Sequence, residues 1–329
     1  MNLKSAATAL TAYIDADIPA FLWGAPGVGK SSIVKQIAGS RSWKTIDFRA
    51  STRDPVALMG LPDISGDTAR WKVPDEFPQA DRDGAEGILL LDELNAAAPS
   101  MQAACFGLVL DRRVGDYVLP KGWRVLAAGN RQADRAAAQR MPSALANRFA
   151  HIDVDPDIDT TAEHFNAIGL SPMVVAFLRF RPAMLHMMDG SDLRAFPTPR
   201  AWEQVAKVVD VPSPLRMQLI SGLVGDGAAG EIEGFIRLYK DLPSLDLVLA
   251  NPHSAPVPEA PAARFAIATG LARKVTAQTF ENAMTYVMRI PAREFQIVFA
   301  VDAVRRDPGF SHTQTFTDWS TRNQDVVLG

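Results

Sequence analysis

The stretch that decides the fold is Gly24-Ala25-Pro26-Gly27-Val28-Gly29-Lys30-Ser31, which fits the phosphate-loop pattern G-x-x-x-x-G-K-[ST] at every required position. It follows an apolar, strand-like stretch at residues 20–23. Glycines let the backbone come close enough for its amides to face phosphate oxygens, while the Lys30 ammonium adds a cation and the Ser31 hydroxyl can bind magnesium. The sequence therefore predicts a nucleotide-binding site that runs from Gly24 to Ser32.

A helix is predicted directly after this loop. Apolar residues recur at helical spacing at Ile33, Val34, Ile37 and Ala38, before Gly39. A helix that begins at the loop directs the positive end of its dipole at a bound anion. Strand, loop and helix thus occur in the order that a phosphate-binding site requires.

The length, net charge and composition of the chain limit the class of protein to which it can belong. The chain has 329 residues, a formal net charge of -3 and a sequence pI near 6.0. This length favours two domains over one, and the acidic balance makes nucleic acid an unlikely partner. No apolar run approaches the roughly 18 to 20 residues that span a bilayer, and the N-terminus is typical of an amphipathic helix rather than a signal peptide. We therefore expect no membrane span and a cytoplasmic protein.

Cysteine and histidine usage offers little reactive chemistry. The single cysteine, Cys105, excludes an internal disulfide and a zinc site made of several thiolates. It lies in an apolar segment, 101–110, which favours a buried structural thiol over a reactive one. The histidines show no metal-binding spacing and are expected to be structural: His151, His164, His186, His253 and His312.

Short apolar strands alternate with helical stretches in the first half of the chain. Strands are predicted at 20–23, 45–49, 87–91, 124–128 and 149–154. That pattern predicts an α/β fold with a mainly parallel, five-stranded sheet. The phosphate loop leaves the first strand at its carboxyl end, where open sheets of this kind bind ligands.

Helical patterns replace the strands after about residue 155, for example at 201–211 and 214–224. The proline-rich segment 251–261 is typical of a semi-rigid connector before the last helices. We predict three parts: an α/β nucleotide-binding domain at 1–155, a helical domain at 156–250, and a connector with C-terminal helices at 251–329.

A second signal is the apolar strand at 87–91, which delivers two acids, Asp92 and Glu93, at its end. Carboxylates at that place are costly unless a cation or a reaction needs them. Asp92 would hold magnesium, directly or through water, and Glu93 would polarise the water that attacks the terminal phosphate. The alternative is an acidic pair that merely begins a solvated loop, and the phosphate loop makes that alternative weaker.

The residues around these acids do not favour GTP. A GTPase would be expected to show Asp-x-x-Gly and Asn-Lys-x-Asp, whereas Asp92 is followed by Glu93-Leu94-Asn95, and residues 130–133 are Asn-Arg-Gln-Ala. GTP specificity is therefore unsupported, and the expected metal ion is Mg²⁺.

Another short buried strand, 125–129, ends in Asn130. The Asn130 amide could hydrogen-bond both the attacking water and a terminal phosphate oxygen, acting through orientation rather than proton transfer. Taken alone this signal is weak, since Gly-Asn most often marks a turn.

The order of these motifs resembles the MoxR branch of AAA+ ATPases. The matching stretches are Gly24 to Ser31, Leu90-Leu91-Asp92-Glu93, Ala128-Gly129-Asn130, Ala144-Leu145-Ala146-Asn147-Arg148-Phe149 and Thr198-Pro199-Arg200. The resemblance covers most of the chain and is strongest up to about residue 210. It implies an ATPase that forms a ring, usually hexameric, with ATP bound between neighbouring subunits and a helical lid at 156–250.

Two arginines take their predicted roles from this resemblance. Arg148 matches the arginine finger, which reaches the terminal phosphate of the neighbour's nucleotide; the alternative is a surface or strand-capping arginine. Arg200 matches the second sensor, a lid arginine that touches the phosphates of its own nucleotide, although Thr198-Pro199 also resembles a plain helix start. The rival fingers, which lack the Asn-Arg-Phe context, are Arg112, Arg113, Arg131 and Arg140.

Two segments look extra relative to a minimal domain. Residues 54–78, with Trp71 and Phe77, resemble the insertion in the second helix of this branch. Residues 114–123, with Trp123, resemble its hairpin before the first sensor, which is the position that Asn130 matches. Such loops would face the pore or a partner. The alternative is that the three aromatic residues only pack locally.

The main hypothesis is an ATP-hydrolysing remodeller whose ring acts on a protein client. The resemblance further suggests a partner with a von Willebrand factor A domain. One alternative is an ATP-gated scaffold or switch with negligible turnover. A second is a nucleic-acid motor, which the acidic balance disfavours.

Overall fold

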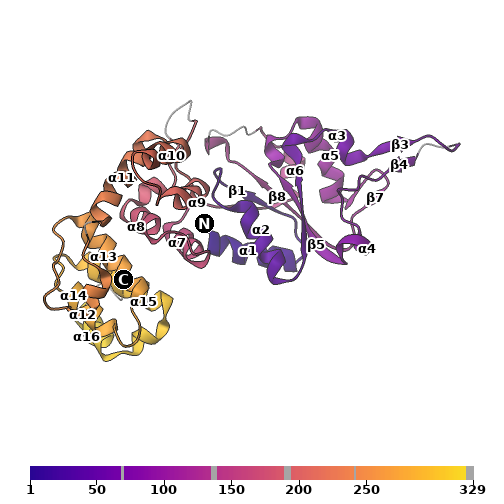
Figure 1. Ribbon diagram of the computed structural model, residues 1–329. Coiled ribbons are helices and arrows are strands. Elements are labelled where there is room, and N and C mark those ends of the chain that lie inside the picture. Colours follow the sequence, from indigo (N-terminus) through magenta and orange to yellow (C-terminus); the bar gives the residue numbers. More distant parts are fainter. Residues whose placement is uncertain (68–69, 135–138, 189–193, 241, 324–329) are drawn as a thin grey trace. The chain divides into compact units, whose positions relative to one another are not determined.

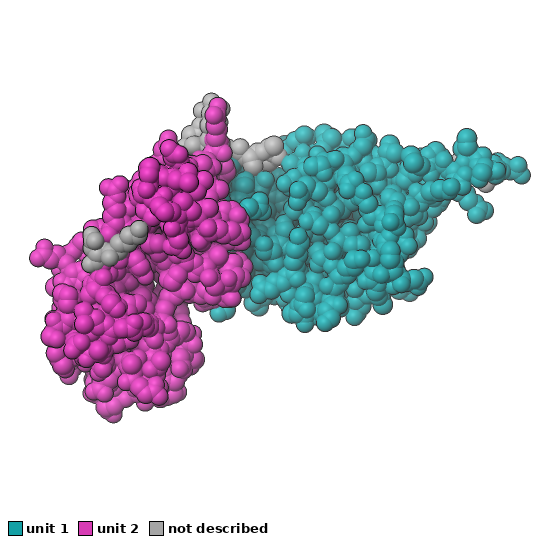
Figure 2. All heavy atoms as spheres, in the orientation of Figure 1, with its two compact units in different colours: residues 1–161, 198–200 teal, residues 162–197, 201–329 magenta. Residues whose placement is uncertain are grey.

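The computed structural model describes residues 1–67, 70–134, 139–188, 194–240 and 242–323. Their contacts divide the chain into two compact units, coloured separately in Figure 2. The first unit comprises residues 1–161 and 198–200, and the second comprises 162–197 and 201–329. The division into three parts stays a prediction.

A five-stranded sheet forms the centre of the first unit (Figure 1). Its strands are β1 Ala20–Trp23, β2 Lys44–Arg49, β5 Glu86–Asp92, β8 Gly122–Gly129 and β9 Ala150–Asp153. They lie in the order β2-β5-β8-β1-β9, and every neighbouring pair is parallel. The predicted α/β fold and all five predicted strands are thereby confirmed.

Helices pack on both faces of this sheet. They are α1 Leu3–Asp15, α2 Lys30–Ser40, α3 Pro55–Met59, α4 Ala80–Asp83, α5 Pro99–Leu110 and α6 Ser143–Ala146. On one face, Ile88 and Leu90 of β5 join an apolar cluster with α1 and α2. On the other face, Leu89 and Leu91 join a cluster with α5. Burial of both faces explains why β5 is a continuous apolar run rather than an alternating one.

Cys105 of α5 belongs to the second of these clusters and is fully buried. Burial raises the pKa of its thiol to about 12. Because the thiolate is the reactive form, the structure supports the predicted structural role for this residue.

Short elements interrupt the α/β order. They include two antiparallel hairpins, β3 Leu61–Asp63 with β4 Arg70–Lys72 and β6 Arg113–Val114 with β7 Tyr117–Val118, and the 3₁₀ turns η1 Ala50–Thr52, η2 Leu94–Ala96 and η3 Gln132–Asp134. The two hairpins touch, because the Trp71 amide donates to Asp116 Oδ2 at 2.9 Å. Phe77 and Trp123 are fully buried, whereas Trp71 is 37% exposed. Two of the three insertion aromatics therefore pack locally.

The regular secondary structure described for the second unit is helical. After α7 Ile158–Ala167, which begins in the first unit, come α8 Pro172–Phe180, η4 Pro182–Leu185, α9 Pro199–Val208, α10 Leu215–Val224, α11 Asp226–Lys240, α12 Leu245–Ala250, α13 Pro261–Lys274, α14 Phe280–Val287, α15 Arg293–Arg306, η5 Pro308–His312 and α16 Gln314–Arg322. A buried ion pair joins α10 to α11, with Arg216 Nε and Nη2 at 2.8 and 2.7 Å from the Glu233 carboxylate oxygens. Across the described ranges, no helix is both long and apolar enough to cross a membrane.

The proline-rich segment 251–261 packs against the last helices. Ala255 is buried in one apolar cluster with residues of α12, α13, α14 and α15. The Tyr286 hydroxyl of α14 donates to the Pro256 carbonyl at 2.7 Å. The segment is therefore anchored at its centre by the helices that follow it.

Asp83 provides a test of the stability of the first unit. Its side chain is buried and accepts hydrogen bonds from the Gln79 amide at 2.9 Å, from Lys44 Nζ at 2.6 Å and from Arg82 Nη2 at 2.8 Å. The Arg82 guanidinium, opposed by burial and assisted by Lys44, holds the pKa of Asp83 well below its usual range. We expect Asp83→Asn to lower the free energy of unfolding by about 2 kcal/mol at pH 7, because hydrogen bonds to a charged group are weakened.

The pH dependence of this loss follows from the lowered pKa. A carboxylate whose pKa falls on folding stabilises the fold fully above its unfolded-state pKa, which is about 4, and stabilises it less as the pH falls toward the folded-state pKa. The difference between the parent protein and Asp83→Asn should thus narrow from pH 7 to about pH 3 in urea unfolding followed by tryptophan fluorescence. Asp81→Asn, at an exposed position of the same helix, is the control. A loss independent of pH would contradict this account.

Candidate nucleotide-binding site

The phosphate loop connects the end of β1 to the start of α2, as predicted. Gly27 and Gly29 have φ angles of 77° and 101°, which side-chain-bearing residues rarely adopt. A Cβ on Gly24 would lie 2.6 Å from the Val154 carbonyl oxygen of the neighbouring chain segment. The local backbone therefore requires glycine at all three positions.

The Lys30 ammonium lies inside this loop. It donates to the carbonyl oxygens of Gly24 and Ala25, at 2.6 and 3.1 Å, and to Asn130 Oδ1 at 2.9 Å. Burial lowers the pKa of Lys30 to about 8, although the nearby Asp92 carboxylate opposes this effect. The structure thus places Lys30 and Asn130, predicted from separate motifs, within hydrogen-bond distance of each other.

Ser31 and Asp92 meet at the carboxyl end of β5. The Ser31 hydroxyl donates to Asp92 Oδ2 at 2.8 Å, and Asp92 Oδ1 accepts from the Glu93 amide at 2.9 Å. Hydroxyl and carboxylate oxygens are ligands that Mg²⁺ prefers, and it commonly takes one or two such protein ligands. The paired oxygens of Ser31 and Asp92 therefore fit a magnesium site.

Glu93 has an unusual backbone for its residue type, with φ 55° and ψ 30°. Non-glycine residues rarely adopt this left-handed conformation, because it is energetically costly. The residues that do adopt it cluster at functional sites. The Ser51 hydroxyl, on the turn that follows β2, donates to Glu93 Oε2. Sequence analysis missed Ser51, because no motif marks it and only the pairing of β2 with β5 brings it to this edge.

Asn95 is a second residue that sequence analysis did not assign. Its side chain is buried, and its amide nitrogen donates to the Asn130 carbonyl at 2.7 Å while its Oδ1 accepts from the Asn130 amide at 3.2 Å. Asn95 therefore holds both backbone polar groups of Asn130. The one sequence signal that could have indicated Asn95 is its position shortly after the acidic pair Asp92-Glu93.

Arg200 lies beside the phosphate loop, and residues 198–200 belong to the first unit. A Cβ on Gly27 would be 2.9 Å from Thr198 Oγ1 and 3.4 Å from Arg200 Cβ. The positive charge of Arg200 also contributes to the lowered pKa of Lys30. The structure thus places Arg200, the predicted second sensor, next to the phosphate loop.

Arg148 lies elsewhere, on the turn between α6 and β9, and is exposed. In the described part of the chain, its guanidinium has no hydrogen-bond or ion-pair partner. An exposed arginine that has no partner among the described residues is available to another subunit. The role of Arg148 as a finger stays a prediction.

Two of the rival fingers are engaged within their own chain. Arg131 Nη1 lies 2.8 Å from Asp155 Oδ1, and Arg131 also pairs with Asp134. Arg112 Nη2 donates to the carbonyl oxygens of Pro120 and Trp123. These contacts give both arginines structural roles. Arg113 and Arg140 are exposed.

Comparison with known protein families finds a match for the part of the chain that contains most of this site. The sequence from residue 19 to residue 149, from just before β1 to just before β9, matches the family described as AAA domain (dynein-related subfamily). This part of the chain is an AAA domain. The phosphate loop, Asp92, Glu93, Asn130 and Arg148 all lie inside the AAA domain, whereas Arg200 lies outside it.

Solved structures that are similar to most of the chain include NtrX from Brucella abortus in complex with ADP, at 15% identity and a TM-score of 0.44. That similarity covers 89% of this chain and 64% of NtrX, so the chain spans less than two thirds of NtrX. A RuvB mutant from Thermotoga maritima has 15% identity and a TM-score of 0.41, with 87% of each chain covered. No curated protein matches the chain significantly.

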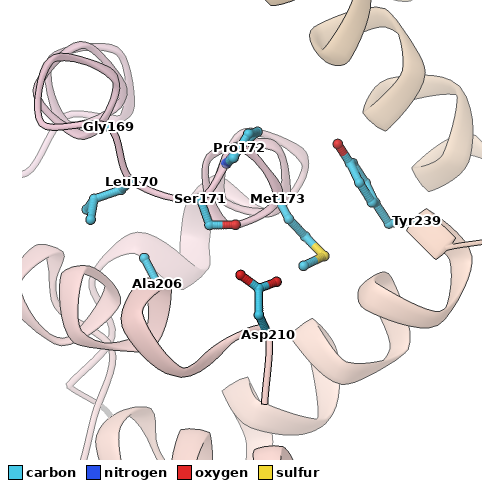
Figure 3. Close-up of a pocket in the computed structure, with 8 residues that line it drawn as sticks. All are labelled: Gly169, Leu170, Ser171, Pro172, Met173, Ala206, Asp210 and Tyr239. Atoms are coloured by element: carbon cyan, nitrogen blue, oxygen red, sulfur yellow. The ribbon is translucent and has the colours of Figure 1, made fainter. Parts of the chain in front are cut away.

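The second unit contains a cavity of its own, shown in Figure 3. It has a volume of about 450 Å³ and is lined by residues 169–173 with Ala206, Asp210 and Tyr239. The Asp210 carboxylate points toward Ser171 and Met173 in this view. None of the lining residues belongs to the predicted nucleotide site.

Proposed function

We propose that the chain is a magnesium-dependent ATPase of the MoxR type that works as a ring. The observation that carries the proposal is the meeting of Lys30 with Asn130 and of Ser31 with Asp92 at the carboxyl ends of the central strands. Cation, polar amide, hydroxyl and carboxylate are the groups that phosphoryl transfer uses. Glu93, one residue beyond Asp92, supplies a carboxylate within the same site.

Each residue then has a separate task. The loop amides and Lys30 bind the phosphates, and Lys30 can exchange its bond to Asn130 for one to a phosphate oxygen. Asn130, held by Asn95, orients the attacking water, and Glu93 accepts its proton. Ser31 and Asp92 would hold Mg²⁺, which when bound neutralises charge on the β- and γ-phosphate oxygens. Arg200 would contact the phosphates from the start of α9.

The proposed active unit is an assembly rather than one chain. Arg148 would reach the nucleotide of the neighbouring subunit and complete its site. Hydrolysis would drive the helical region as a lid, and the two hairpins would pass the change to a protein client. A partner with a von Willebrand factor A domain, a hexameric ring and a cytoplasmic location are parts of the proposal that rest on sequence resemblance.

Lys30→Ala tests whether the phosphate loop binds the nucleotide. We expect nucleotide affinity to fall by about 10- to 100-fold, because a charge-assisted hydrogen bond contributes about 1.5–3 kcal/mol and 1.4 kcal/mol corresponds to tenfold. Titration with a fluorescent ATP analogue measures the dissociation constant.

The matched control is Lys35→Ala, on the same helix. Its side chain is 59% exposed and lies 3.7 Å from Asp47, so we expect unchanged affinity. Equal affinities for the parent protein and Lys30→Ala would place the nucleotide elsewhere and overturn the proposed site.

A further inference from the structure

We propose that His151 is a positioning residue for Arg148, joining the turn that carries this arginine to the strand that begins the phosphate loop. The inference rests on the proposed function, in which Arg148 acts on the neighbouring subunit. Neither the motifs nor the expected structural role of the histidines assigned His151 such a part.

Both ring nitrogens of His151 are used. Trp23 Nε1 donates to His151 Nδ1 at 2.8 Å, and His151 Nε2 lies 3.0 Å from the Ala146 carbonyl oxygen. The indole nitrogen can only donate, so Nδ1 must be the acceptor. Nε2 then carries the hydrogen and donates a hydrogen bond to the Ala146 carbonyl oxygen. The imidazole in this one tautomer bridges β1 and the last residue of α6, although the His151 side chain is exposed to solvent.

The Ala146 carbonyl, which accepts the hydrogen bond from His151, also stabilises the turn that carries Arg148. The same Ala146 oxygen accepts from the Phe149 amide at 3.1 Å, while the Arg148 amide donates to the Leu145 carbonyl at 3.1 Å. The backbone on both sides of Arg148 is thereby fixed, and its guanidinium is left without a partner among the described residues. With its backbone fixed and its guanidinium unpaired within the described ranges, Arg148 can extend toward another subunit.

Aromatic packing keeps the bridge in register. Phe21 and Trp23 stack on the same side of β1 with ring centroids 4.1 Å apart, and the His151 ring lies 6.0 Å from Trp23 at an interplanar angle of 30°. Phe149 packs edge-on against Phe21 at 5.5 Å. Pairing of β1 with β9 sets Phe21 opposite His151, so the contacts follow from the sheet itself.

The other end of the bridge is the first residue before the phosphate loop. Trp23 precedes Gly24, and its carbonyl accepts from the Val154 amide at 2.7 Å. The His151 imidazole therefore connects the residue before the subunit's own phosphate loop to the turn that carries Arg148, which is proposed to act on the neighbouring subunit. Misplacement of a catalytic group by about 1 Å can lower a rate on the order of 100-fold. Loss of this bridge should therefore reduce the contribution of Arg148 to the rate of hydrolysis without abolishing it.

A mixed assembly separates this role from general damage. The donor subunit carries Glu93→Gln, which presents Arg148 but cannot turn over its own nucleotide. The receiver carries Arg148→Ala, which keeps Glu93 but offers no finger. A receiver site next to a donor is complete, so the mixture should release phosphate although each parent alone is nearly inactive. His151→Phe, which keeps a stacking ring and removes both hydrogen bonds, is then added to one partner at a time.

We expect His151→Phe in the donor to reduce the restored rate by about tenfold, since the finger is misplaced. In the receiver, which has no finger to position, the same change should alter the rate by less than about twofold, and this arm shows that the variant folds and binds nucleotide. Equal losses in both arms, or no loss in the donor, overturn the inference and leave the proposed function standing. No restored activity in the starting mixture overturns the proposed function, and the inference falls with it.

Discussion

Glu93→Gln is expected to bind ATP as tightly as the parent protein while its steady-state phosphate release falls by about 100- to 10,000-fold. Glutamine is nearly the same size and can still accept the hydrogen bond that the Ser51 hydroxyl donates to Glu93. It cannot accept a proton from the attacking water. The variant should therefore lose the chemical step and keep the ground-state complex.

The control for this change is Glu86→Gln, at the opposite end of the same strand. Glu86 is exposed and its carboxylate accepts from Trp43 Nε1, away from the predicted site. Both affinity and turnover should be unchanged. Normal hydrolysis by Glu93→Gln would contradict the assignment of the base. A parent protein without turnover, alone or with its partner, would favour the ATP-gated scaffold.

Arg148→Ala should lower the rate of hydrolysis by about three to five powers of ten, the contribution that an arginine finger makes. The nucleotide affinity of the variant should change little, because this guanidinium has no predicted contact with the cradle of its own chain. In the parent protein, activity per subunit should rise with protein concentration as subunits associate. Phosphate release at several concentrations measures both effects.

Arg140→Ala distinguishes Arg148 from an exposed rival. Arg140 lies outside the Asn-Arg-Phe context, and we expect this change to leave turnover within about threefold of the parent, as surface substitutions usually do. A larger loss in Arg140→Ala than in Arg148→Ala would move the finger to the rival position. Full activity of a monomeric preparation would remove the need for any finger and contradict the ring.

The elements of the site that were predictable are those coded by adjacent residues. The phosphate loop is a run of eight positions whose glycine conformations depend on local backbone, and the observed φ angles of Gly27 and Gly29 agree with that requirement. The central strands β5 and β8 were predictable because strands buried on both faces are largely continuous apolar runs. Asp92 and Glu93 stood out because charged residues directly follow such a run.

Ser51 and Asn95 could not be assigned in the same way. Ser51 contacts Glu93 across 42 positions of sequence, and Asn95 contacts Asn130 across 35. Serine and asparagine occur at many turns, so neither residue type marks a function by itself. Their roles depend on which strands lie side by side, and the order β2-β5-β8-β1-β9 does not follow the chain.

The sequence by itself determined that this protein has a phosphate loop at the end of a parallel strand and an acidic pair at the end of another. Local backbone sterics and the continuous burial of parallel strands make both features visible in consecutive residues. Tertiary structure alone decided that Lys30 meets Asn130 across 100 positions, that Ser31 meets Asp92, and that His151 joins Trp23 to the Arg148 turn. Such contacts form only when strand pairing brings distant segments to one edge of the sheet, and no local pattern records that pairing.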